Sequence, residues 1–176
     1  SVTNFLSFRD KQTISFVATS DKSNIEELTC QPKENAPRLL KMVLIYGANA
    51  SGKSNLLQAI QALWQMLVTP RLAENDPIYI HAPFALSKSD PTEFNIVFWI
   101  KDRKFTYDIT YNNIEILYEH MQYITYKGGF ATMYKRENSK IEFGGTTDIT
   151  AKQKDDLIKE TLKNHTVLST LNKKNI

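Results

Sequence analysis

The sequence is poor in features that mark secreted or membrane-bound proteins. It has one cysteine, Cys30, among its 176 residues, so it cannot form an internal disulfide, and a reducing compartment suits it best. No apolar run approaches the length of a bilayer-spanning helix. Residues 1–5 show no basic region followed by an apolar signal core. These absences predict a cytoplasmic protein with no membrane partner.

Signs of several other classes of site are also lacking. The net charge is only +3, and the basic residues are scattered among acids. Contact with DNA or RNA is compatible with this charge, but the charge does not indicate it. His81, His120 and His165 lie far apart with no Cys or His at ligand spacing, which argues against a zinc site. Ser51 and Ser54 lack a His–Asp constellation for nucleophilic catalysis.

One specific motif is present, since residues 47–54 match the pattern Gly-x4-Gly-Lys-[Ser/Thr] of a phosphate-binding loop. The apolar run 39–46 precedes it and predicts a strand buried on both faces. A helix should follow and end at Pro70, because apolar residues recur at intervals of three and four. A buried strand, the loop and a helix are the context that this motif requires. The predicted apolar stripe comprises Leu56, Leu57, Ile60, Leu63, Trp64 and Leu67.

Each residue type of the loop has a physical role in holding phosphates. Successive backbone N–H groups form a concave anion site, and Gly52 lets the phosphates approach the positive end of the helix dipole. Lys53 should bridge the β- and γ-phosphates, and the hydroxyl of Ser54 should bind Mg²⁺. Asn55 would extend the wall of amides, and no catalytic residue is predicted. The expected binding residues are Gly47, Ala48, Asn49, Ala50, Ser51, Gly52, Lys53, Ser54 and Asn55.

The opening of the chain predicts a hairpin and a loop. Residues 2–8 and 12–18 are expected to form two short strands, with alternation at Ile14 and Phe16. Residues 20–37 are rich in polar residues and should form a loop with at most one helical turn.

The second half of the chain has a different residue pattern. After an extended connection over 70–92, residues 93–145 alternate aromatic and polar positions between regularly spaced turn signals, which predicts an antiparallel meander of four to six strands. Trp64 and Trp99 are expected in the core. Thr150 should cap a helix over 151–163. The buried side of that helix would comprise Leu157, Ile158 and Leu162.

Two phrases together resemble a known family. The phrase Asn4-Phe5-Leu6-Ser7-Phe8, followed by the loop at 46–56, is similar to the start of bacterial AAA-type, ABC-like ATPases. These include the overcoming-lysogenization-defect proteins and the heads of structural-maintenance-of-chromosomes proteins. The resemblance implies an α/β P-loop fold, ATP as the nucleotide, and a role in nucleic-acid transactions or antiphage defence. It also implies dimerisation through the nucleotide site, an effector protein as partner, and a nucleotide or subunit contact for Arg9, which otherwise is a solvent-exposed turn charge.

Later elements of that family pattern are not found. There is no Leu-Ser-x-Gly-[Glu/Gln] signature and no apolar strand ending in Asp-Glu. Asp102 follows an apolar run, but Arg103 and an alternating strand come next, so a hairpin turn is expected there. Residues 143–146 contain two glycines and are also expected to form a turn. The chain is therefore interpreted as the N-terminal part of one ATPase domain that binds nucleotide but does not hydrolyse it alone. Its parts would be a nucleotide-binding core (1–69), a sheet (93–145) and the start of a helical arm (150–176).

Two other functions remain open at this point. One is a non-catalytic module in which nucleotide binding sets the assembly state. The other, less favoured, is a small P-loop kinase, since kinases of this size add a basic lid where this chain has an aromatic meander.

Overall fold

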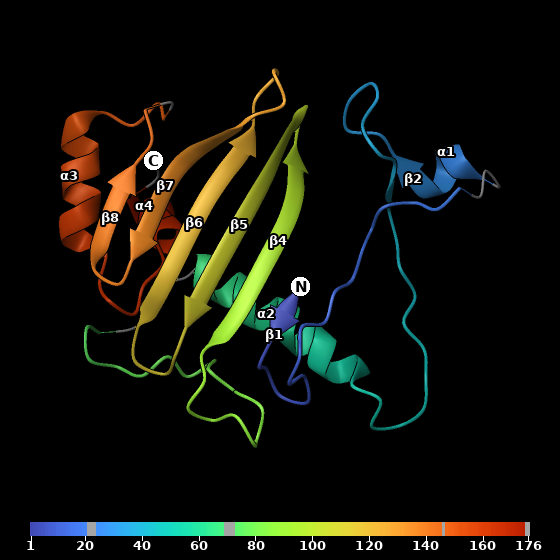
Figure 1. Cartoon of the computed structure of the whole chain (residues 1–176), viewed down its shortest axis with the longest axis horizontal. Helices are drawn as coiled ribbons and strands as arrows, with labels where there is room; N and C mark the ends of the chain where they lie inside the picture. Colours follow the sequence, from blue (N-terminus) through green and yellow to red (C-terminus); the bar gives the residue numbers. More distant parts are fainter. Residues whose placement is uncertain (21–23, 69–72, 146, 175–176) are drawn as a thin grey trace.

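A five-stranded antiparallel meander forms the body of the protein. The computed structural model describes residues 1–20, 24–68, 73–145 and 147–174. Consecutive strands of the meander are hydrogen-bonded neighbours (Figure 1), which confirms the sheet predicted for residues 93–145. A short strand, β1 (Val2–Thr3), adds to the free edge of β4. The strands of the meander are β4 (Thr92–Ile100), β5 (Arg103–Tyr111), β6 (Ile116–Ile124), β7 (Phe130–Glu137) and β8 (Lys140–Phe143).

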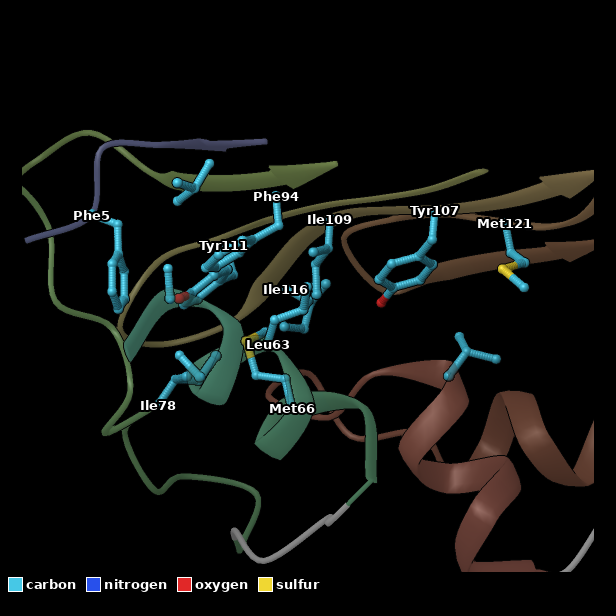
Figure 2. Packing of buried hydrophobic residues seen from close by; sticks show 14 of the residues in the cluster. Phe5, Leu63, Met66, Ile78, Phe94, Tyr107, Ile109, Tyr111, Ile116 and Met121 are labelled. Carbon is cyan, nitrogen blue, oxygen red and sulfur yellow. The ribbon is translucent and has the colours of Figure 1, made fainter. Parts of the chain in front are cut away.

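The alternation in these strands separates an apolar face from a polar one. On the apolar face, Phe94 pairs with Ile109, and Tyr107 pairs with Met121. Helix α2 (Lys53–Val68) packs against this face (Figure 2). Its buried residues are Ala59, Ala62, Leu63 and Met66.

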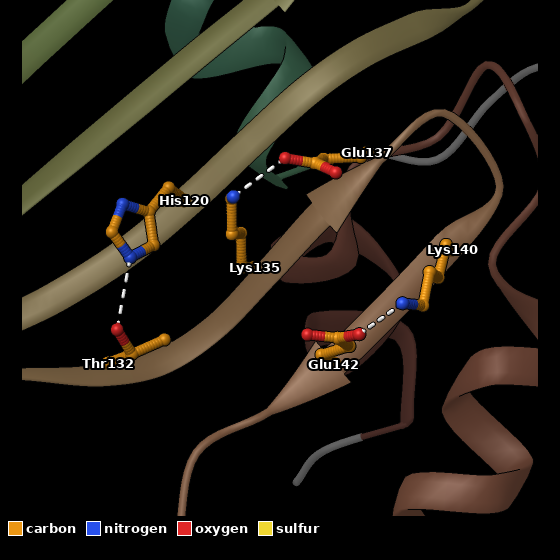
Figure 3. A network of polar contacts seen from close by, with 6 residues as sticks. All are labelled: His120, Thr132, Lys135, Glu137, Lys140 and Glu142. Carbon is orange, nitrogen blue, oxygen red and sulfur yellow. Dashed lines mark hydrogen bonds and ion pairs between the residues drawn. The ribbon is translucent and has the colours of Figure 1, made fainter.

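The opposite face of β6, β7 and β8 carries charged and polar side chains (Figure 3). Lys135 and Glu137 form an ion pair at 2.6 Å, and Lys140 and Glu142 form another at 2.5 Å. Exposed pairs of this kind add little to stability, because water screens them. Their effect is to keep this face of the sheet hydrated, so the core forms on the other side only.

Two helices follow the sheet, α3 (Ala151–Glu160) and α4 (Val167–Lys174). Thr150 caps α3 as predicted, within a capping box shared with Gln153. The helix ends three residues earlier than expected, and of its predicted apolar side Leu157 is buried while Ile158 is 41% exposed.

A side chain just before α4 and one within it hold the end of α2. The hydroxyl of Thr166 donates to the carbonyl of Met66 at 2.9 Å, and the Asn172 amide donates to that of Val68 at 2.8 Å. These carbonyls lie in the last turn of α2, where helix geometry leaves them without intrahelical partners. The helix that begins in the phosphate loop is thereby tied to the C-terminal helices.

The strand predicted for residues 39–46 is the main error of the sequence interpretation. Only β3 (Leu39–Leu40) is a strand, and it pairs with β2 (Thr29–Cys30) next to the single-turn helix α1 (Ile25–Leu28). Beyond it the chain is exposed, with Leu44 at 76% and Tyr46 at 93%. A strand buried on both faces needs hydrogen-bonded neighbours and two covering layers. Figure 1 shows instead that the α1–β2 segment stands apart from the sheet, and that one extended stretch joins it to the region of β1 and another joins it to α2.

Two further expectations need correction. The opening hairpin is reduced to β1, a turn at residues 4–8, and isolated bridges at Gln12 and Val17. The apolar stripe of α2 is rotated, because the face that carries two alanines packs closest to the sheet. Leu57, Ile60 and Trp64 are each at least half exposed, whereas Leu63 is buried. Trp99 is half-buried, and Pro70 lies outside the described residues.

Candidate nucleotide site

The phosphate loop closes around the ammonium group of Lys53. The Nζ atom donates to the carbonyls of Gly47 at 2.8 Å and Ala48 at 2.6 Å, and it lies 3.5 Å from the hydroxyl oxygen of Ser51. The lysine therefore neutralises the carbonyl dipoles that point into the loop. A phosphate group that enters the loop would offer this ammonium stronger, charged acceptors.

The backbone of the loop forms a tight turn that leads directly into α2. Ser51 N–H donates to the carbonyl of Ala48 at 3.3 Å, and Ala50 and Gly52 have φ angles of 62° and 90°. The helix ladder begins with the bond from Leu56 N to Gly52 O at 3.1 Å. The N–H groups before it have no acceptor within the helix, and they carry its partial positive charge. An anion placed at the start of α2 would therefore be electrostatically favoured.

The structure brings all nine predicted binding residues into this one junction of loop and helix. Residues 47–51 and Ser54 are exposed, and residues 52, 53 and 55 are half-buried. The hydroxyl of Ser54 is an oxygen ligand of the kind that Mg²⁺ accepts, and phosphates and water can complete the coordination. The side-chain amide of Asn55 donates to the hydroxyl of Ser7 at 2.6 Å.

Residues that the sequence interpretation did not assign to the site lie beside Gly52. A Cβ atom placed on this glycine would be 3.2 Å from the ring of Phe8 and 3.4 Å from Oγ of Ser7. Both residues belong to the phrase Asn4-Phe5-Leu6-Ser7-Phe8. The resemblance of this phrase to the start of the family's sequences was the only signal that could have pointed to these two residues. Arg9, the residue proposed from that resemblance, is exposed at the end of the same turn.

A second polar cluster lies beneath the meander and serves the fold. Glu119 is fully buried and accepts hydrogen bonds from the hydroxyls of Tyr107 at 3.0 Å and Tyr134 at 2.6 Å, and from Val167 N at 3.0 Å. Burial raises the pKa of Glu119, and these hydrogen bonds partly oppose that rise. Beside it, Arg136 donates to three backbone carbonyls in the segment that connects α3 to α4. These are the carbonyls of Leu162, Lys163 and His165. The cluster fixes the C-terminal helices to the sheet.

Within the described ranges, no helix is both long and apolar enough to cross a bilayer.

Comparison with known proteins places this chain in a family. Residues 42–176 match the family described as "AAA domain, putative AbiEii toxin, Type IV TA system". The match covers well over half of the chain, so the protein belongs to this family, and its domain is of the AAA, P-loop-like class that binds nucleotides. No curated protein and no solved structure matches the chain.

Proposed function

We propose that this protein binds ATP together with Mg²⁺ at residues 47–55, as the N-terminal part of an ABC-like ATPase domain. The observation that carries the proposal is the position of Lys53, whose ammonium group lies at the centre of an exposed loop that ends at the positive end of the 16-residue helix α2. Membership of the AAA family supports the same conclusion independently of this geometry.

In this proposal each group has a defined task. The N–H groups of the loop and of the first helical turn bind phosphate oxygens, and the Lys53 ammonium moves from the carbonyls of Gly47 and Ala48 to the β- and γ-phosphates. The Ser54 hydroxyl contributes one ligand to Mg²⁺. A magnesium ion supplies charge neutralisation between the phosphates when it is bound.

The exposed apolar side chains support the assignment to one part of a larger ATPase domain. They lie on the chain leading into the loop and on α2, and further protein would bury them. The family description, which names a toxin of a toxin–antitoxin system, is consistent with a role in antiphage defence. ATP hydrolysis, dimerisation around the nucleotide, and an effector protein or nucleic acid as partner belong to this proposal for the complete domain. The exposed apolar residues are Met42, Leu44, Ile45, Tyr46, Leu57, Ile60 and Trp64.

Calorimetry with Mg²⁺-ATP tests the proposal. The unaltered chain should bind, Lys53→Ala should lose binding, and Lys152→Ala should bind normally, since it removes the same charge from the exposed first turn of α3. Ser54→Ala should weaken binding in Mg²⁺ far more than in EDTA. Equal affinities of the Lys53→Ala and Lys152→Ala variants would refute the assignment of the site. Competition with GTP measures the preference for adenine.

A further inference from the structure

The turn that opens the chain, residues 4–8, has a conformation held by its own backbone. Phe5 and Phe8 exchange two hydrogen bonds, each of 2.8 Å. Asn4 and Leu6 have left-handed φ angles of 51° and 50°. A leucine in this region costs on the order of 1 kcal/mol, so the surrounding contacts must hold the turn in place.

Asn4 supplies most of those contacts. Its side chain is buried and donates to the carbonyls of Ser87 at 3.1 Å, Asp90 at 2.8 Å and Pro91 at 3.2 Å, while its Oδ1 atom accepts from Phe84 N at 3.0 Å. These partners lie in the connection that leads into β4. The opening turn is therefore joined firmly to the edge of the sheet.

The tip of the turn contacts the phosphate loop on both sides of Lys53. Ser7 Oγ accepts the 2.6 Å hydrogen bond from Asn55, two residues after the lysine. The ring of Phe8 lies against Gly52, the residue before it. The Ser7–Asn55 contact spans 48 positions in the sequence and the Phe8–Gly52 contact spans 44, so neither arises from local chain geometry.

We propose that Ser7 is a positioning residue of the nucleotide site, acting through Asn55. This inference rests on the proposed function, and it adds to the site a residue that lies outside the phosphate-loop motif. The turn is anchored to the sheet by Asn4, and Ser7 extends that anchorage to the first turn of α2. The N–H groups around Lys53 are then held in one arrangement before the phosphates arrive, and a preformed site loses less entropy on binding.

A double-mutant cycle tests the proposal, with Mg²⁺-ATP as the probe. Without the contact the freed groups must be ordered on binding, at a cost of about 1 kcal/mol, so Ser7→Ala and Asn55→Ala should each raise Kd about fivefold. The double variant should bind no more weakly than either single variant, because both remove the same contact. Ser7→Thr keeps the hydroxyl and should restore the affinity. Ser139→Ala, in the exposed turn between β7 and β8, should bind like the unaltered chain.

The outcomes separate this inference from the proposed function. If the unaltered chain does not bind Mg²⁺-ATP, both are wrong. If it binds, and Lys53→Ala does not, while Ser7→Ala keeps the original Kd, only the positioning role is wrong. A lower thermal midpoint for Ser7→Ala with an unchanged Kd would likewise overturn it, since the residue would then serve the fold alone. Additive losses in the double variant would show that Ser7 does not act through Asn55.

Discussion

The buried carboxyl group of Glu119 gives a sharp test of what holds the C-terminal helices to the sheet. Its Oε1 atom accepts from the hydroxyls of Tyr107 and Tyr134, and both of its oxygens lie within 3.2 Å of Val167 N. In Glu119→Gln the shape is kept, but one oxygen becomes an N–H₂ donor. Whichever way the amide turns, at least one buried donor faces another donor.

The cost follows from that mismatch. Leaving a buried donor unsatisfied costs about 1–3 kcal/mol, so we expect a loss of about 2 kcal/mol. With a urea m-value of about 2 kcal/mol/M, the midpoint of unfolding should fall by about 1 M. Glu142→Gln is the matched control, because that residue is exposed on β8 and should leave the midpoint unchanged. A midpoint for Glu119→Gln within about 0.2 M of the original would refute this account of the cluster.

The same variant also predicts how stability depends on pH. Burial is the main cause that raises the pKa of Glu119 in the folded protein above its ordinary value of 4.5. The folded state then binds this proton more tightly than the unfolded state, so the stabilising contribution is complete below pH 4.5 and is lost as pH rises through the raised pKa. Glutamine does not titrate. The stability gap between the unaltered protein and Glu119→Gln should therefore narrow as pH rises, and a gap that widens would contradict the direction of the shift.

Three further substitutions have defined outcomes. Gly52→Ala should lower stability and weaken nucleotide binding by roughly 1 kcal/mol or more, because φ is 90° and the new Cβ would meet Phe8; urea unfolding and calorimetry measure the two effects. Gly144→Ala would place a Cβ 1.7 Å from a backbone oxygen of β7 and should cost about 1–3 kcal/mol, whereas Gly145→Ala meets nothing within 4 Å and should be tolerated in the same melts. Thr150→Ala should cost about 1 kcal/mol through loss of the capping box, and Thr150→Ser should restore it. Equal melting of the two variants in either comparison would contradict the stated cause.

Local signals in the sequence predicted the parts of the fold that local chemistry determines. The alternation through Phe105, Tyr107, Ile109 and Tyr111 predicted the meander, because every second side chain of a strand points to the buried face of the sheet. The cap at Thr150 was predicted for the same reason, since its partner Gln153 is only three residues away. The nine residues at 47–55 were placed together because they are contiguous. Whether they bind nucleotide is a question for the experiments above.

Contacts between distant parts of the chain could not be predicted from the sequence. No local signal reports that the Asn55 amide would meet Ser7, or that Thr166 would cap the end of α2, because those partners are 48 and 100 positions apart. The phrase containing Ser7 was noticed through its resemblance to a family opening. Its physical connection to the phosphate loop became visible only in three dimensions.

The failure at residues 39–46 has a physical cause that bears on function. An apolar run shows that burial would be favourable, but it does not supply the neighbouring strands and layers that burial requires. The described chain offers its first two residues only β2, an isolated bridge from Val17 and a hydrogen bond to the Phe16 carbonyl. Apolar residues of α2, such as Trp64, are exposed in the same way. Under the proposed function these surfaces lie on the two elements that flank the phosphate loop. Protein that covered them would therefore contact the chain on both sides of the loop.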